Sequence, residues 1–120
     1  MAACGVKPEN IFTTYVPGAF ELSVTAKLLA KSNQFDVLMC LGCLIKGDTM
    51  HFEYIAQATS SGVMQVALES CVPTIFGVLT VLNKQQAVVR STGSHNEGLS
   101  WGLSAVEMGL ARRSAAVDRC

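Results

Sequence analysis

The sequence predicts an α/β fold in which a parallel sheet is covered by helices on both faces, giving three layers. Strand-like and helix-like patterns alternate along the chain, as in folds of this class. The segment 35–45 is almost continuously apolar, which is typical of a parallel strand buried on both faces. Half of the 120 residues are apolar, enough for one core, so we expect a single domain over residues 1–120.

The first half of the chain shows two strand signals and two helix signals. Residues 11–15 (IFTTY) are β-branched or aromatic and predict a strand. After a Pro-Gly turn, apolar residues at helical spacing predict a helix that ends at Ser32 and Asn33. The apolar segment 35–45 predicts the next strand, and the KGDT turn leads into a long helix over 51–70.

The second half continues the alternation. TIFGVLTV (74–81) predicts another buried strand, and Asn83 is a candidate N-cap for a helix over 83–90. A final helix is expected over 98–113. In parallel sheets ligands bind beyond the carboxyl ends of the strands, so we expect the site in the loops that follow them.

Composition narrows the choice of partner. Lysine plus arginine and aspartate plus glutamate number nine each, so a net charge of zero gives no electrostatic reason to expect nucleic acid or an anionic membrane as partner. Charged residues make up only 15% of the chain, and we expect other copies to cover apolar surface in a homo-oligomer.

The compartment is inferred from apolar stretches and cysteines. No stretch is long enough to predict a membrane span, and residues 1–10 lack the apolar region of a secretion signal. Five cysteines, an odd number, fit reduced thiols in a cytoplasmic protein. Cys40 and Cys43 have redox-motif spacing, but residues three apart in a strand point to opposite faces. We therefore expect neither a metal site nor a redox pair.

The turn before the long helix is the strongest candidate site. Gly47 lets the chain turn, Asp48 or Thr49 can cap the helix, and free N–H groups at its start would attract a phosphate. His51, in the first helical turn, is suited to exchanging protons near pH 7, and Arg90 could close the site. The alternative is that the turn merely caps a helix and His51 is a partly exposed residue, since capping is commoner than phosphate binding.

Four blocks of the sequence, between about residues 5 and 110, stand out: VPGAFEL, LGCLIKGDTMHFEYI, VPTIFGVLTVLNKQQAVVR and GLSAVEMG. Together, and in this order, they resemble the 6,7-dimethyl-8-ribityllumazine synthase family. The motif (R/K)-G-x-T-x-H-(F/Y)-(D/E)-Y after a strand is specific. The resemblance implies a flavodoxin-like three-layer sandwich and a pentamer or larger shell.

The resemblance also implies the activity, the penultimate step of riboflavin biosynthesis. There 5-amino-6-(D-ribitylamino)uracil condenses with 3,4-dihydroxy-2-butanone 4-phosphate, and phosphate and water are lost. The chemistry passes through an imine, phosphate elimination and ring closure, without metal or cofactor. By the same resemblance, His51 transfers protons, Asp48 and Thr49 hold the phosphate, and Arg90 grips it from the other side.

A second set of residues is implied to contact the ribitylaminouracil. This set is Ala19, Phe20, Glu21, Cys43, Leu44, Ile45 and Phe76. The first three face the ribityl chain, where Glu21 accepts hydrogen bonds from hydroxyl groups. The next three line the pyrimidine ring, largely through backbone contacts, and Phe76 contributes to the pocket of a neighbouring subunit.

The chain departs from the family at its N-terminal end. The family's first strand, the aromatic segment that stacks on the pyrimidine and most of the first helix are missing before residue 5. We therefore expect a fragment or misplaced start, with unpaired strand edges and low stability. A non-catalytic subunit that assembles, or binds a flavin-like ligand, without turnover is the alternative. A flavodoxin-like regulator would need a phosphoacceptor, for which Asp48 is the only candidate.

Overall fold

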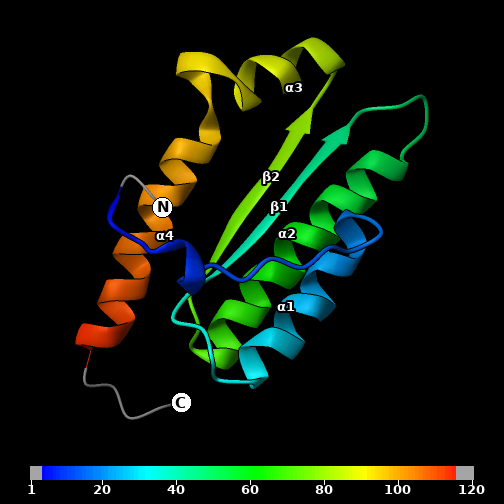
Figure 1. The fold of residues 1–120 in the computed structure, drawn as a ribbon. Helices are drawn as coiled ribbons and strands as arrows, with labels where there is room; N and C mark the ends of the chain where they lie inside the picture. Colours follow the sequence, from blue (N-terminus) through cyan, green and yellow to red (C-terminus); the bar gives the residue numbers. More distant parts are fainter. Residues whose placement is uncertain (1–3, 116–120) are drawn as a thin grey trace.

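The computed structural model describes residues 4–115 (Figure 1). In chain order its elements are the 3-10 helices η2 (Pro8–Asn10) and η3 (Ala19–Glu21), α1 (Leu22–Lys31), β1 (Leu38–Ile45), α2 (His51–Ser70), β2 (Thr74–Val81), α3 (Lys84–Ser91), η4 (Gly93–His95) and α4 (Glu97–Ser114). The helices predicted over 51–70, 83–90 and 98–113 are confirmed to within one residue at each end. The helix before β1 ends as predicted, with Ser32 as its C-cap.

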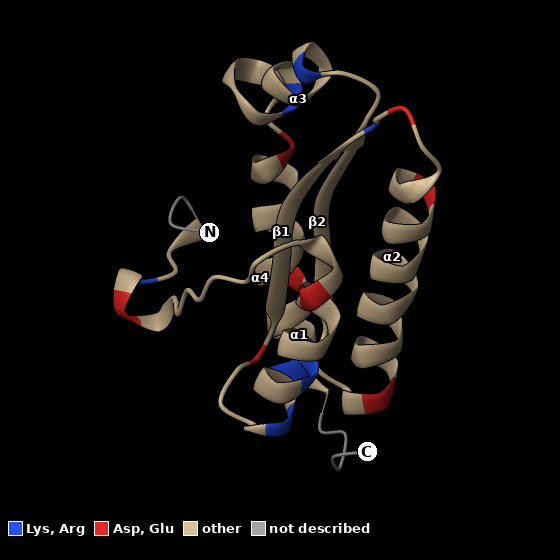
Figure 2. Cartoon of the chain, turned by 90° about the vertical axis from the view of Figure 1, so that its right-hand side faces the viewer, with Lys and Arg blue, Asp and Glu red and all other residues tan. Residues whose placement is uncertain are grey.

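The sheet in the described chain has two parallel strands. Leu38 of β1 is paired with Thr74 of β2, and the register runs without a break to Ile45 and Val81. Helices α1 and α2 cover one face, and α4 lies on the other, so the strands stand between two helical layers (Figures 1 and 2). This confirms the α/β fold.

The core lies between β1 and the helix pair α1 and α2. Its buried members are Ala26, Ala30, Leu38, Cys40, Val63, Val66 and Val72. The two helices approach closely, because a Cβ atom on Gly62 would lie 2.5 Å from Oγ of Ser23. On the other face, Trp101 of α4 packs over Gly77, where an added Cβ atom would lie 3.0 Å from the indole ring.

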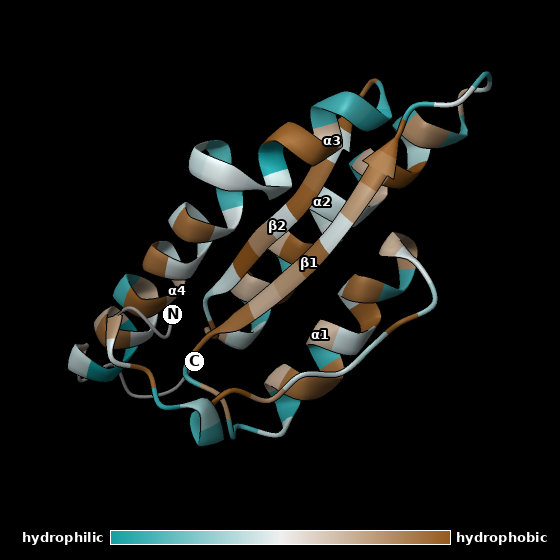
Figure 3. Ribbon diagram, turned by 45° about the horizontal axis from the view of Figure 1, so that its top comes forward, coloured by the Kyte–Doolittle hydropathy of each residue, from teal (hydrophilic) through white to brown (hydrophobic). Residues whose placement is uncertain are grey.

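The second half of β1 is less buried than its sequence predicts. The strand is apolar along nearly its whole length (Figure 3), yet Leu41 is 57% exposed and Ile45 46% exposed. Both residues point away from the α1 and α2 layer, and α4 packs mainly against β2. The prediction of burial on both faces is therefore wrong here: an apolar strand is buried only where a helix covers it.

The predicted strand at 11–15 is not formed. Residues 11–16 have no regular secondary structure, and Phe12 and Tyr15 are exposed. Only the Phe12 ring has an aromatic partner, Phe35, with ring centroids 5.7 Å apart. A strand needs a neighbour for its backbone N–H and C=O groups, and no strand of residues 4–115 runs beside this segment. The β-branched and aromatic composition of residues 11–15 is therefore not enough to form a strand.

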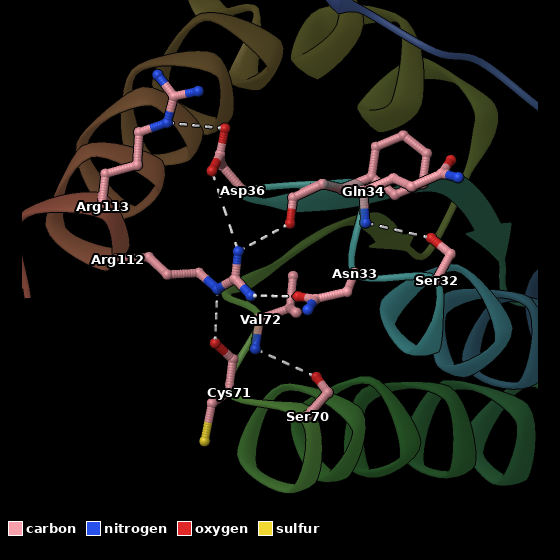
Figure 4. Close-up of polar contacts among 10 residues, drawn as sticks. Ser32, Asn33, Gln34, Asp36, Ser70, Cys71, Val72, Arg112 and Arg113 are labelled. Atoms are coloured by element: carbon pink, nitrogen blue, oxygen red, sulfur yellow. Dashed lines mark hydrogen bonds and ion pairs between the residues drawn. The ribbon is translucent and has the colours of Figure 1, made fainter. Parts of the chain in front are cut away.

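An arginine of α4 holds together the amino-terminal end of the sheet (Figure 4). Arg112 donates from Nε to the carbonyl of Cys71 at 3.0 Å, and from Nη1 to that of Phe35 at 3.0 Å. Nη2 reaches Oδ1 of Asn33 at 3.3 Å. Nearby, Arg113 pairs with Asp36 at 3.0 Å. These contacts tie α4 to the loops that precede both strands.

The cysteines have different environments. Cys40 is buried and Cys43 exposed, which fits their predicted placement on opposite faces of β1. Burial raises the pKa of the Cys40 thiol to about 11. Cys4, Cys40 and Cys43 are free, but Cys71 is disulfide-bonded, so the expectation of reduced thiols throughout is wrong at Cys71.

Candidate functional site

The carboxyl ends of both strands lie at one end of the sheet (Figure 1). The turn over residues 46–50 follows β1, and α3 follows β2. The N–H group of Lys46 donates to the carbonyl of Val81 at 2.9 Å, which extends the pairing beyond the last residue of β1. The two segments predicted to hold phosphate, the turn and α3, are thus brought to the same end.

The N-cap residue of α2 is Met50, which makes no side-chain cap, and Thr49 lies just before it. Oγ1 of Thr49 accepts a hydrogen bond from the N–H group of His51 at 3.3 Å, and the carbonyl of Met50 accepts from Tyr54 at 3.4 Å. The prediction that Asp48 or Thr49 caps this helix is therefore wrong as to the N-cap position, although the Thr49 side chain contacts the first residue of α2. Asp48, Thr49 and His51 are all exposed. The imidazole of His51 is therefore accessible to solvent at the amino end of a 20-residue helix, where the helix dipole favours anions.

An ion pair that the sequence reasoning missed spans this turn. Nζ of Lys46 contacts the carboxylate of Glu53 and lies 5.7 Å from the ring centroid of Phe52. The hydrogen bond from Lys46 lowers the pKa of Glu53. Both residues stand in the motif, at its (R/K) and (D/E) positions, but periodicity does not show that residues 46 and 53 meet.

Arg90 lies on α3 and faces solvent. Its Nη1 donates to the carbonyl of Gln86 on the same helix at 3.3 Å. A shallow depression of about 330 Å³ is lined by Asn83, Gln85, Gln86, Val89 and Arg90. The predicted cap is confirmed, since Oδ1 of Asn83 accepts from the N–H group of Gln86 at 2.9 Å. The guanidinium is thus carried on a capped helix and remains open to a ligand.

A second groove joins two segments that were predicted to bind substrate. Its volume is about 200 Å³, and it is lined by Val16, Gly18, Ala19, Leu22, Leu41, Gly42 and Cys43. It lies between the Pro-Gly turn and the second half of β1. Buried Thr59 of α2 donates to the carbonyl of Ala19 at 3.2 Å and so fixes η3 beside this groove.

The remaining predicted residues lie apart from this groove or at its margin. Phe20 is 58% exposed, and Glu21 folds back on the turn, with its Oε2 3.1 Å from where a Cβ of Gly18 would lie. Leu44 is half-buried and Ile45 exposed near the end of β1. Phe76 packs against the core cluster. His51 lines neither the groove nor the Arg90 depression, so one chain does not gather all the predicted residues in one cavity.

Two further structural facts concern ligands and membranes. Residues 4–115 contain no group of three His, Cys, Asp or Glu side chains placed to hold a metal ion. In the same residues, none of the helices combines the length and apolar character that crossing a bilayer requires.

Comparison with known proteins gives one consistent match. The family model for 6,7-dimethyl-8-ribityllumazine synthase matches residues 1–113. The protein of that name from Pyricularia oryzae is 40% identical over an alignment that covers 99% of this chain and 79% of the relative. Its namesake from Schizosaccharomyces pombe is 50% identical, over 88% of this chain and 67% of the relative. The protein of that name from Coxiella burnetii is 48% identical, over 87% of this chain and 70% of the relative. The chain belongs to the 6,7-dimethyl-8-ribityllumazine synthase family.

Proposed function

We propose that this chain is a transferase of riboflavin biosynthesis that forms 6,7-dimethyl-8-ribityllumazine. Its substrates in this proposal are 5-amino-6-(D-ribitylamino)uracil and 3,4-dihydroxy-2-butanone 4-phosphate. Family membership supports the reaction. The observation that carries the proposal is the groove that Ala19 and Cys43 line together, because the resemblance assigned both to the same substrate and they lie 24 positions apart in the sequence.

The phosphate end of the reaction is assigned to the turn before α2. Thr49 and the backbone N–H groups of the turn would hold the phosphate, and Arg90 would approach it from α3. The carboxylate of Asp48 repels an anion, so Asp48 acts through its N–H group. His51, exposed in the first turn of α2, accepts the proton released in the elimination and returns a proton to a leaving oxygen.

The ribitylaminouracil is assigned to the groove beside β1. Ala19, Phe20 and Glu21 would face the ribityl chain, and Cys43, Leu44 and Ile45 would line the ring. No covalent nucleophile is required, because holding the amine against the carbonyl and moving protons suffices for imine formation and ring closure. We assign Phe76 to a neighbouring subunit's pocket, as the resemblance implies.

Assembly into a homo-oligomer, a pentamer or a larger shell, is part of the proposal. Large apolar side chains are exposed on several elements, among them Leu28 at 65%, Tyr54 at 70% and Leu68 at 72%. Surfaces of this kind mark contacts between proteins. An oligomer would also bring parts of two chains together, which suits a chain whose predicted site residues line separate depressions.

The proposal includes a cytoplasmic location and no nucleic-acid partner. The free thiols at the exposed Cys4 and Cys43 support a reducing compartment, whereas the disulfide at Cys71 argues against it. Charged side chains are sparse along the described chain (Figure 2), and the net charge is zero. Cell fractionation with an antibody against the chain tests the location.

Replacing His51 by Ala tests the catalytic assignment. We expect kcat to fall by about 10²- to 10⁴-fold, the range for losing a general acid–base group, with circular dichroism and melting unchanged. His95→Ala is the matched control, because His95 is also exposed but lies on η4. Product formation followed by absorbance gives the rate.

Two results would contradict the proposal. A wild-type chain that binds ribitylaminouracil but forms no product is a non-catalytic subunit. An active wild type whose rate is unaffected by His51→Ala refutes the role of His51 and leaves the activity in place.

A further inference from the structure

We propose that Lys46 and Glu53 form a brace across the phosphate-binding turn, which holds residues 47–50 in place and keeps a negative charge from repelling the phosphate. The inference rests on the proposed function, since it assigns two positioning residues to the phosphate site. Neither residue was among the candidates from the sequence, and the contact between them is the observation that carries it.

The brace joins two firmly held points. Lys46 is fixed to the sheet, because its N–H group donates to the carbonyl of Val81 at 2.9 Å. Glu53 lies in the first turn of α2, within a 20-residue helix. Between them, Gly47 through Met50 are exposed, and two long hydrogen bonds tie this stretch to α2: from the N–H group of His51 to Oγ1 of Thr49 at 3.3 Å, and from that of Tyr54 to the carbonyl of Met50 at 3.4 Å. The side-chain pair therefore closes a loop that its own hydrogen bonds hold only weakly.

The pair is about one third exposed to water, whereas one oxygen of its carboxylate is buried. The Lys46 and Glu53 side chains are 35% and 38% exposed, and Nζ also lies over the ring of Phe52 at 5.7 Å. Oε2 of Glu53 is buried and accepts no hydrogen bond from the described residues. Lys46 is thus the principal compensation for this carboxylate, whose pKa it lowers.

Losing Lys46 and losing Glu53 should affect phosphate binding differently, because the two residues carry opposite charges. Glu53 places a negative charge at the end of α2 where the phosphate would bind, and Lys46 neutralises it. Removing Lys46 leaves an uncompensated carboxylate that repels the phosphate, whereas removing the charge of Glu53 leaves a cation that does not. Loss of Lys46 should therefore be the more harmful change, and removing the Glu53 charge as well should reverse part of the damage.

The experiment compares Lys46→Met, Glu53→Gln and the double variant in the full chain. We expect Lys46→Met to raise KM for the phosphorylated substrate by about three- to tenfold, with KM for ribitylaminouracil unchanged. Glu53→Gln should raise this KM by less, and the double variant should have a lower KM for the phosphorylated substrate than Lys46→Met has. Lys46→Arg, which keeps the charge, should remain close to wild type.

A matched ion pair supplies the control. Lys27 of α1 and Glu69 of α2 meet at 2.7 Å, with side chains 48% and 45% exposed, and lie away from the turn. We would remove this ion pair by the same substitutions, Lys27→Met, Glu69→Gln and both together. We expect no change in KM for either substrate. If the Lys46 and Glu53 variants differ from these controls only in melting temperature, the brace is structural and the proposal is wrong.

A binding measurement separates this inference from the proposed function. Inorganic phosphate is titrated against each variant while the amide NMR signals of residues 47–51 are followed. An inactive wild type with weaker phosphate binding in Lys46→Met, restored in the double variant, refutes the synthase activity and supports the brace. An active wild type whose phosphate affinity is the same in all variants overturns the brace alone.

Discussion

The hydroxyl of Thr59 donates a hydrogen bond to the carbonyl oxygen of Ala19 at 3.2 Å, across 40 positions of sequence. Thr59 is 1% exposed, so this bond is shielded from water. Ala19 lines the groove assigned to ribitylaminouracil, and η3 carries the neighbouring Phe20 and Glu21. One buried hydroxyl on the helix that begins with His51 thus positions the segment assigned to the other substrate.

Thr59→Val removes this bond with little change of shape. We expect a loss of about 1–2 kcal/mol in unfolding free energy, the range for one buried hydrogen bond, and a rise in KM for ribitylaminouracil. Ser60→Ala is the control, because the Ser60 hydroxyl donates to Gln57 within α2 and does not reach η3. Steady-state kinetics with each substrate varied in turn gives both KM values. An unchanged KM for ribitylaminouracil would show that η3 does not contact that substrate.

The cap of α3 offers a test of the role of Arg90. Asn83 accepts from the N–H group of Gln86, and Oε1 of Gln86 accepts from that of Leu82 at 2.8 Å, so two side chains cap the helix reciprocally. Asn83→Ala should cost about 1 kcal/mol in stability and loosen the eight-residue helix that carries Arg90. We expect a higher KM for the phosphorylated substrate.

Asn96→Ala is the control for that experiment, because Asn96 caps α4 in the same way, accepting from Gly98 at 2.9 Å, on a helix without an assigned phosphate ligand. If both cap variants change that KM equally, the effect comes from general destabilisation and the assignment of Arg90 to phosphate loses its support.

Arg112 should matter for stability and leave the chemistry unchanged. Its guanidinium satisfies two backbone carbonyls and the Asn33 side chain, and it lies at the amino-terminal end of the sheet, opposite the candidate site (Figures 1 and 4). We expect Arg112→Met to lower the unfolding free energy by about 2–4 kcal/mol, since it leaves partly buried acceptors unpaired.

Arg113→Met is the matched variant. Arg113 is 69% exposed and pairs only with Asp36 among the described residues, so we expect a loss below about 1 kcal/mol. Urea unfolding measures the unfolding free energy of both variants. Their kcat values are compared at a temperature where each variant is folded. A fall in kcat for folded Arg112→Met would mean that the loops before the strands influence the site.

The helices could be predicted because their signals are local. The end of α1 at Ser32, the cap at Asn83 and the spacing of apolar residues in α2 depend on neighbours a few positions away. The parallel pairing of β1 and β2 followed from the helix between them. The turn before α2 was also found from local features, since a glycine, a threonine and a histidine stand together in the chain.

The failures share a dependence on distant parts of the structure. Residues 11–15 have the composition of a strand, but pairing requires a neighbour in space, which composition does not reveal. Leu41 and Ile45 are apolar yet exposed, because α4 packs mainly against β2. The contacts between Lys46 and Glu53 and between Thr59 and Ala19 depend on how helices sit against the sheet, and no periodicity shows them.

The buried thiol of Cys40 gives a pH dependence of stability with a definite sign. Burial raises its pKa from 9.0 to about 11. In the unfolded chain the thiol loses its proton once the pH exceeds 9.0, its ordinary pKa. In the folded protein it keeps the proton until the pH reaches about 11. The contribution is therefore fully present below pH 9.0 and is lost as the pH rises to about 11.

We expect the stability advantage of wild type over Cys40→Ala to shrink by about 2 kcal/mol between pH 8 and pH 10.5, from 1.36 kcal/mol per pKa unit. Guanidinium unfolding at both pH values measures it. Val63→Ala is the control, because Val63 is buried in the same cluster but does not ionise, so its cost should be equal at both pH values. A difference between wild type and Cys40→Ala that does not change with pH would mean that the thiol reaches water, and hence that the packing of β1 against α1 and α2 is looser than the structure indicates.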